Sequence, residues 1–124
     1  MTPQILTQVV DVLKTVFKKF NYSLSGIKST WHSDPSFRQW CLLVLVSDIS
    51  ALCFINNKMG IVLILVLGWL LLASELINTA VESVVDLVST DYHPLAKKSK
   101  DAASAMTLLT FISLLTSWVA YIRI

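Results

Sequence analysis

Five polar residues interrupt a long apolar stretch in the second half of the chain. They are Glu75, Asn78, Thr79, Glu82 and Asp86. At 100° per residue they fall within one stripe of an α-helix, about 100° wide. Magnesium prefers a few carboxylate oxygens together with phosphate oxygens, so the stripe is a candidate for binding a metal and a phosphate.

A second polar face follows across a short loop and supplies positive charge. Its members are Lys97, Lys100, Asp101 and Ser104. They share one side of a predicted helix at the depth of Glu82, and Asp34 starts an earlier segment at that same depth. Carboxylates from two helices and a lysine from a third can therefore converge. Phosphoryl transfer needs chiefly positioning and neutralised charge, so this set suits a metal-bound nucleotide.

Three apolar segments must position these residues, over 35–55, 59–88 and 102–122. Hydrophobic residues make up 55% of the 124-residue chain, which is too apolar for a small soluble protein. At 1.5 Å per residue the first segment is about 31 Å long and can cross a hydrocarbon core of ~30 Å. We expect a single all-α membrane domain with three transmembrane helices.

The N-terminal region, about 4–30, predicts a further helix of a different kind. Apolar residues recur there at helical spacing: Ile5, Leu6, Val9, Val10, Leu13, Val16, Phe17 and Phe20. Polar residues, several of them lysines, alternate with them. This pattern is typical of an amphipathic helix on a membrane surface and not of a signal peptide.

Basic residues set the expected orientation. Most precede the first apolar segment or lie between the second and third, whereas Lys58 and Arg123 fall on the other side. By the positive-inside rule the N-terminus and the second loop are cytoplasmic. Counted from Gly60, Glu75 then lies about 22 Å into the core, within the inner leaflet, and Glu82 about 33 Å along, at the interface. Intramembrane ionisable residues are expensive and usually functional.

Other interpretations of these residues stay open. The sequence Asp34-Pro35 is also a helix-start signature, in which Asp34 is only an N-cap. Asp86 and Glu82 could pair with lysines as a structural network, and Glu75 could be a protonated hydrogen-bond donor between helices. Asp48, deep in the first segment, is expected to bond a neighbouring helix or subunit.

Composition excludes two classes of function. The net charge of +2 is spread along the chain and forms no basic stripe, which argues against nucleic-acid binding. The three glycines, Gly26, Gly60 and Gly68, cannot make a glycine-rich phosphate loop. Side chains must therefore hold the phosphates of any nucleotide that binds.

Three stretches resemble the signature of the prokaryotic diacylglycerol kinase and undecaprenol kinase family. They are ELINTAVESVVD at 75–86, YHPLAK at 92–97 and KDAASA at 100–105. The resemblance implies an ATP- and Mg²⁺-dependent kinase that phosphorylates diacylglycerol to phosphatidic acid at the cytoplasmic membrane face. It also implies a homotrimer in the bacterial cytoplasmic (inner) membrane, with active sites between subunits.

The resemblance assigns roles to residues by position. Glu75 would be the general base, and Asp34 and Glu82 would bind the metal. The ATP-binding positions would be Tyr22, Asn78, Asp91, Tyr92, His93, Lys100 and Asp101. The lipid-binding positions would be Lys28, Trp31, Phe37, Arg38, Gln39 and Trp118.

The chain also departs from the best-known members of the family. Asp34 stands where those members have glutamate, Thr15 replaces an arginine, and Trp40 replaces an acidic residue. Undecaprenol is an alternative acceptor, because HPLAK at 93–97 resembles the undecaprenol kinases. A non-catalytic membrane bundle, such as a channel or an assembly subunit, and an inactive family member are the remaining alternatives.

Overall fold

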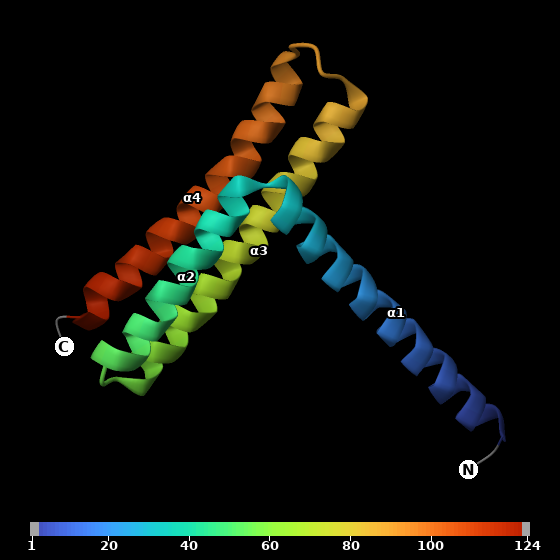
Figure 1. The fold of residues 1–124 in the computed structure, drawn as a ribbon, viewed down its shortest axis with the longest axis horizontal. Coiled ribbons are helices and arrows are strands. Elements are labelled where there is room, and N and C mark those ends of the chain that lie inside the picture. The colour runs from blue at the N-terminus through green and yellow to red at the C-terminus, as the bar shows by residue number, and fades with distance from the viewer. Residues whose placement is uncertain (1–2, 123–124) are drawn as a thin grey trace. The chain divides into compact units, whose positions relative to one another are not determined.

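The computed structural model of the chain describes residues 3–122, which contain four α-helices (Figure 1). They are α1 (Pro3–Ser33), α2 (Pro35–Phe54), α3 (Lys58–Val88) and α4 (Pro94–Ile122). The predicted all-α fold is confirmed. Helix α1 is one compact unit, the three following helices form another, and each is described by itself. Arg123, used above to predict orientation, lies outside the described residues.

Helix α1 confirms the predicted N-terminal helix and presents its apolar side chains to the surroundings. Leu13, Val16, Phe17 and Phe20 are 62%, 59%, 66% and 57% exposed. Together with Lys14 they line one open apolar groove. Exposed apolar surface of this size is typical of a segment that contacts a membrane or a partner.

Helices α2, α3 and α4 are each long and apolar enough to cross a membrane. They contain 20, 31 and 29 residues. Many large apolar side chains on their outer faces are exposed, among them Leu42 at 64%, Leu70 at 51% and Leu109 at 64%. Such exposure is costly in water but favourable where lipid chains cover the surface.

Local hydrogen bonds fix the starts of these helices. The Asp34 side chain caps α2 by accepting a bond from Ser36 N at 2.8 Å, with Pro35 as the first helical residue. Asn57 caps α3 through a 3.1 Å bond from Gly60 N. The predicted cap at Asp34 is therefore confirmed.

Helix α4 begins at Pro94, well before the predicted apolar segment at 102–122. His93 Nδ1 accepts a 3.2 Å bond from Leu95 N, and Pro94 has the backbone φ that a first helical turn needs. The polar residues that follow, including Lys100 and Asp101, therefore lie on a helix with defined directions.

Helix α3 packs against both α2 and α4 (Figure 1). The buried apolar core is a small cluster: Val44, Ala51, Ile55, Ile64, Leu71 and Leu114. Side-chain contacts also join α2 to α4, since the rings of Trp40 and Phe111 lie 5.1 Å apart and Trp118 Nε1 donates to Ser47 Oγ at 2.9 Å. Figure 1 shows α3 and α4 continuing together beyond the start of α2.

Gly68 allows α3 to pack closely against α2. A Cβ atom at this position would lie 2.9 Å from Val44 Cγ1 and 3.2 Å from Asp48 Oδ1. Asp48 Oδ1 is buried and has no hydrogen-bond partner among residues 3–122. The expected bond from this oxygen to a neighbouring helix is therefore absent from the described residues, and a bond to another subunit stays a prediction.

Replacing Gly68 by Ala should destabilise the bundle by about 1–3 kcal/mol, because the new methyl group collides with the buried, β-branched Val44. Thermal unfolding in detergent measures the loss. Gly26→Ala is the control: its Cβ meets nothing within 4 Å, and alanine favours helix by about 1 kcal/mol over glycine. Equal stability of Gly68→Ala and the unsubstituted protein would contradict the close packing.

Candidate active site

Glu75 is a carboxyl group enclosed by all three helices of the bundle. It lies on α3 and is only 3% exposed. Its Oε1 accepts a hydrogen bond from Ser36 Oγ on α2, and its Oε2 accepts one from Thr107 Oγ1 on α4 at 3.1 Å. The buried ionisable residue predicted from the sequence is therefore present, and each of its oxygens has a hydroxyl donor.

Both carboxylate oxygens of Asp34 contact residues of the bundle, namely Ser36 on α2 and Thr79 on α3. Oδ1 accepts from Ser36 N at 2.8 Å and lies 2.9 Å from Ser36 Oγ, whose single proton is shared between this oxygen and Glu75 Oε1. Oδ2 accepts from Thr79 Oγ1 at 2.7 Å. Partial burial raises the pKa of Asp34, but hydrogen bonds, chiefly from Thr79 and Ser36, lower it by more, so the pKa lies below its ordinary value. Asp34 is thus a carboxylate at neutral pH, as a cation ligand must be.

Glu82 and Asn78 form the next polar group along α3. Asn78 Nδ2 donates to Glu82 Oε1 at 3.3 Å, while Asn78 Oδ1 is buried without a hydrogen-bond partner among residues 3–122. A buried amide oxygen with an unused lone pair, beside a carboxylate, is suited to a cation or to a water bound by one.

The donor set fits magnesium only in part. The oxygen atoms of Asp34, Glu82 and Asn78 are of the type that Mg²⁺ prefers. Within the described part of the chain, however, no three His, Cys, Asp or Glu side chains are grouped as a metal site. A magnesium ion here would need phosphate and water oxygens to complete its six ligands.

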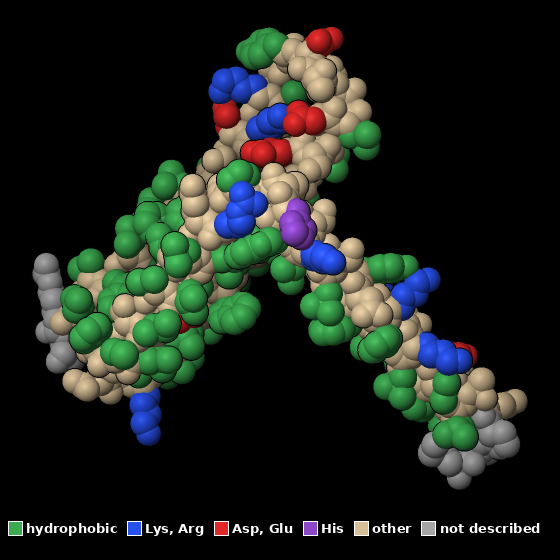
Figure 2. Space-filling model, viewed as in Figure 1, with side chains coloured by type: hydrophobic (Ala, Val, Ile, Leu, Met, Phe, Trp, Pro, Cys, Tyr) green, Lys and Arg blue, Asp and Glu red, His purple; other side chains and the backbone are tan. Residues whose placement is uncertain are grey.

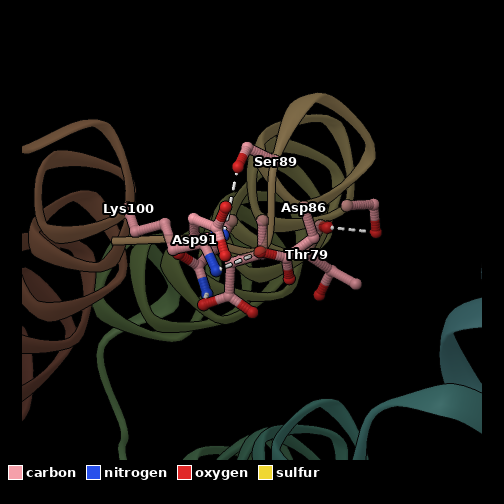
Figure 3. A network of polar contacts seen from close by, with 8 residues as sticks. Thr79, Asp86, Ser89, Asp91 and Lys100 are labelled. Carbon is pink, nitrogen blue, oxygen red and sulfur yellow. Dashed lines mark hydrogen bonds and ion pairs between the residues drawn. The ribbon is translucent and has the colours of Figure 1, made fainter. Parts of the chain in front are cut away.

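Charged side chains gather where α3 and α4 run together (Figure 2). Lys100 Nζ on α4 reaches Asp86 Oδ1 on α3 at 2.5 Å (Figure 3), and Lys97 pairs with Asp101 within α4. Of the ion pairs left open as an alternative above, the one between Asp86 and Lys100 is present, whereas Glu82 bonds Asn78. At 36% and 52% exposure, Lys100 and Asp86 are open to exchange of partners.

Two adjoining cavities of about 430 and 370 Å³ lie at this end of the bundle. Both are lined by three residues predicted to bind ATP: Asp91, Tyr92 and His93. The larger cavity is otherwise mainly apolar, and the smaller adds Asp86, Lys97, Lys100 and Asp101. Their volumes lie in the range of small-molecule sites.

The polar groups therefore follow one another along α3. Glu82 is seven positions after Glu75, or about 10 Å along the helix, and Asp86 is eleven positions after Glu75, or about 16 Å. The buried carboxyl, the Asn78 and Glu82 pair and the exposed charges thus lie in a row. Such a row can present a phosphate chain to a group held deeper in the bundle.

The remaining predicted residues lie on α1, on α2 and farther along α4. Tyr22, Lys28 and Trp31 belong to α1, which is described by itself, and Lys18 Nζ lies 5.8 Å from the centre of the Tyr22 ring. Of the other lipid-binding candidates, Phe37 is buried, Arg38 and Trp118 are half-buried, and Gln39 is exposed. Trp118 lies about 16 Å along α4 from Thr107.

Sequence reasoning missed the two residues that contact the carboxyl group of Glu75. A signal for Thr107 was present, because it continues by three residues the polar face that ends at Ser104. Ser36 gave a weaker signal, since a serine after Asp34-Pro35 is also ordinary in a helix's first turn. Which residue each hydroxyl contacts depends on how the helices rotate about their axes.

Known proteins resemble this chain over most of its length. Residues 21–122 match the family described as prokaryotic diacylglycerol kinase. A diacylglycerol kinase of Helicobacter pylori strain 26695 is 36% identical over 109 residues, which are 88% of this chain and 85% of that protein. The diacylglycerol kinases of Escherichia coli K12 and Pseudomonas aeruginosa PAO1 are 30% and 32% identical, over 83% and 86% of this chain and 84% and 86% of their own lengths.

Breaking the ion pair between Asp86 and Lys100 should change folding stability by under about 1 kcal/mol, because both side chains are exposed. Thermal unfolding of Asp86→Asn and Lys100→Met in detergent measures the change in folding stability. Gly68→Ala is the positive control, because it is expected to lose stability in the same assay. A loss of several kcal/mol in either charge variant would show that the pair holds the fold together. Lys100 could then not exchange Asp86 for another partner.

Proposed function

The chain belongs to the prokaryotic diacylglycerol kinase family, and we propose that it transfers the γ-phosphoryl group of ATP to the hydroxyl of diacylglycerol, with Mg²⁺ as cofactor. The product is phosphatidic acid, and the reaction takes place at the cytoplasmic face of the bacterial inner membrane. Family membership and the fold support a lipid kinase whose three long apolar helices can span a membrane.

One observation carries the proposal most directly: the Glu75 carboxyl is buried among helices long enough to span a membrane. A general base must lie within hydrogen-bond reach of the proton that it accepts. A group at this depth is reached by the hydroxyl of a lipid more readily than by that of a soluble alcohol. Glu75 accepts the proton of the acceptor hydroxyl as its oxygen forms the new bond to phosphorus and the bond to ADP breaks.

Asp34 and Glu82 are the proposed metal ligands; Glu82 accepts a bond from Asn78, whose side-chain oxygen has no hydrogen-bond partner among residues 3–122. Bound magnesium supplies positive charge that neutralises the phosphate oxygens. The lowered pKa of Asp34 keeps this side chain ionised, as binding of a cation requires. Asp34 is one methylene shorter than glutamate, and its two hydrogen-bonded oxygens occupy fixed positions.

Lys100 is the proposed phosphate ligand at the exposed end of the row. Its ammonium group already faces a carboxylate oxygen of Asp86, so a phosphate oxygen can replace that partner without a change of sign. The smaller cavity, with Lys97 and Lys100, suits the phosphates, and the larger, more apolar one suits the base. Asp91, Tyr92 and His93 line both cavities and would therefore contact the nucleotide between its base and its phosphates.

The membrane arrangement is proposed from charge and surface character. The basic residues of α1 and of the start of α4 favour a cytoplasmic N-terminus and a cytoplasmic loop between α3 and α4. The exposed apolar side chains of α1 fit a helix on the membrane surface. We further propose self-association as a homotrimer. Contact of the lipid with Lys28, Trp31, Phe37, Arg38, Gln39 and Trp118 stays a prediction.

Replacing Glu75 by Gln should lower kcat for phosphatidic acid formation by about a hundredfold or more, because the amide cannot accept the hydroxyl proton. Labelled product formed from ATP, Mg²⁺ and diacylglycerol in detergent micelles measures the effect. The near-isosteric change should leave the melting temperature close to that of the unsubstituted protein. Ser113→Ala is the control, because among the described residues that hydroxyl donates to the carbonyl of Leu109 in its own helix. Unchanged turnover in Glu75→Gln would remove Glu75 from the mechanism.

A further inference from the structure

We propose that Ser36 and Thr107 are positioning residues that orient the Glu75 carboxylate for proton transfer. The inference rests on the proposed function, because it assigns a purpose to contacts of the proposed general base. The Ser36 hydroxyl contacts Oε1 and the Thr107 hydroxyl contacts Oε2, and the two hydroxyls come from different helices. Each oxygen of the base is therefore held from a separate rigid element.

Two donors are needed because the terminal torsion of a glutamate is soft. Rotation about this torsion has broad minima, so burial alone leaves the plane of the carboxylate poorly defined. A hydroxyl on each oxygen defines that plane. Thr107 is itself held in the core, since it is only 5% exposed and its Oγ1 lies 3.4 Å from the buried Ser74 Oγ.

These contacts orient the base without neutralising it. A carboxylate has about four acceptor sites on its two oxygens, and the two hydroxyls occupy one site on each. One site on each oxygen thus remains for the proton of an acceptor alcohol. A hydroxyl brings no formal charge, whereas a lysine in either place would pair with the carboxylate as a counter-ion.

Ser36 also connects Glu75 to Asp34. Ser36 Oγ lies 2.9 Å from Asp34 Oδ1 and contacts Glu75 Oε1, so a single hydroxyl lies between the proposed metal ligand and the proposed base. The backbone N–H of Ser36 bonds Asp34 separately at 2.8 Å. Removing the hydroxyl leaves this backbone cap bond in place and removes the contacts of Ser36 Oγ with both carboxylates, while Asp34 Oδ2 keeps its bond from Thr79.

Other hydroxyls of α4 show what an ordinary membrane-helix hydroxyl does. Thr110, Ser113 and Thr116 donate to the carbonyl four residues earlier, at 2.9, 2.9 and 2.8 Å. Thr107 differs, because its hydroxyl reaches a carboxylate on α3. This contrast supplies matched controls: Thr110→Val for Thr107→Val, and Ser113→Ala for Ser36→Ala.

The first test separates kcat from KM in the diacylglycerol assay. Ser36→Ala and Thr107→Val should each lower kcat by about 10- to 100-fold, the usual loss when a partner of a functional side chain is removed. KM for MgATP and for lipid should stay within about twofold. Ser36→Thr and Thr107→Ser keep the hydroxyl and should recover most of kcat, and both controls should match the unsubstituted enzyme.

The second test asks whether Ser36 acts through Glu75. In a Glu75→Gln background there is no base left to orient, so adding Ser36→Ala should lower the residual rate by less than about twofold, because contacting residues in one network are not additive. A purely structural effect of Ser36 would reduce kcat by the same factor in both backgrounds, and that result would overturn the inference.

The third test needs no turnover. In protein free of ATP and metal, the infrared carboxyl or carboxylate band that Glu75→Gln abolishes belongs to Glu75. Ser36→Ala and Thr107→Val should each shift this band, because each removes a hydrogen bond to it, whereas Ser113→Ala should leave it in place. An unshifted band in both variants would overturn the inference.

The outcomes separate this inference from the proposed function. An active unsubstituted enzyme, with Ser36→Ala and Thr107→Val indistinguishable from their controls, overturns the inference alone. A folded unsubstituted protein that phosphorylates no lipid alcohol overturns the proposed function and this inference with it. If Ser36→Ala does not fold, Ser36→Cys keeps the side-chain size with a weak donor, and the same loss of kcat is expected.

Discussion

A carboxyl group buried among helices that are long enough to span a membrane is shielded from bulk water, so the protein must supply its hydrogen-bond partners. Glu75 meets this requirement with a hydroxyl from each neighbouring helix. The rotations of α2 and α4 about α3 are thereby tied to one side chain. The same requirement explains why polar residues run along one face of α3, while the outer surfaces of the bundle are apolar.

The polar groups along α3 differ in their access to water. Glu75 is enclosed, Asn78 and Glu82 come next along α3, and Asp86 with Lys100 is exposed beside two cavities. A reaction between a lipid and a soluble nucleotide needs this gradient, because one substrate arrives from the bilayer and the other from water. The chain belongs to the prokaryotic diacylglycerol kinase family, and this change from buried to exposed polar groups suits the lipid kinase reaction of such a protein.

Much of this could be predicted from the sequence, because caps and apolar runs are local signals. The Asp34 cap, the helices and the burial of Glu75 were predicted from residue types and spacing and are confirmed. Lys97 to Ser104 were already predicted to share one helical face, and only the start at Pro94 was missed, because a polar first turn resembles a loop until the bond from Leu95 N to His93 is considered. The contacts of Ser36 and Thr107 depend on helix rotation, which no local pattern determines.

The central claim is phosphoryl transfer to a lipid hydroxyl, and the partition of label among competing acceptors tests it most directly. Purified protein in micelles would receive γ-labelled ATP, Mg²⁺, diacylglycerol and undecaprenol together, with water as the third acceptor. The account predicts label chiefly in phosphatidic acid. Label found only in undecaprenyl phosphate would reassign the acceptor, and label released only as inorganic phosphate, or left in ATP, would contradict the account.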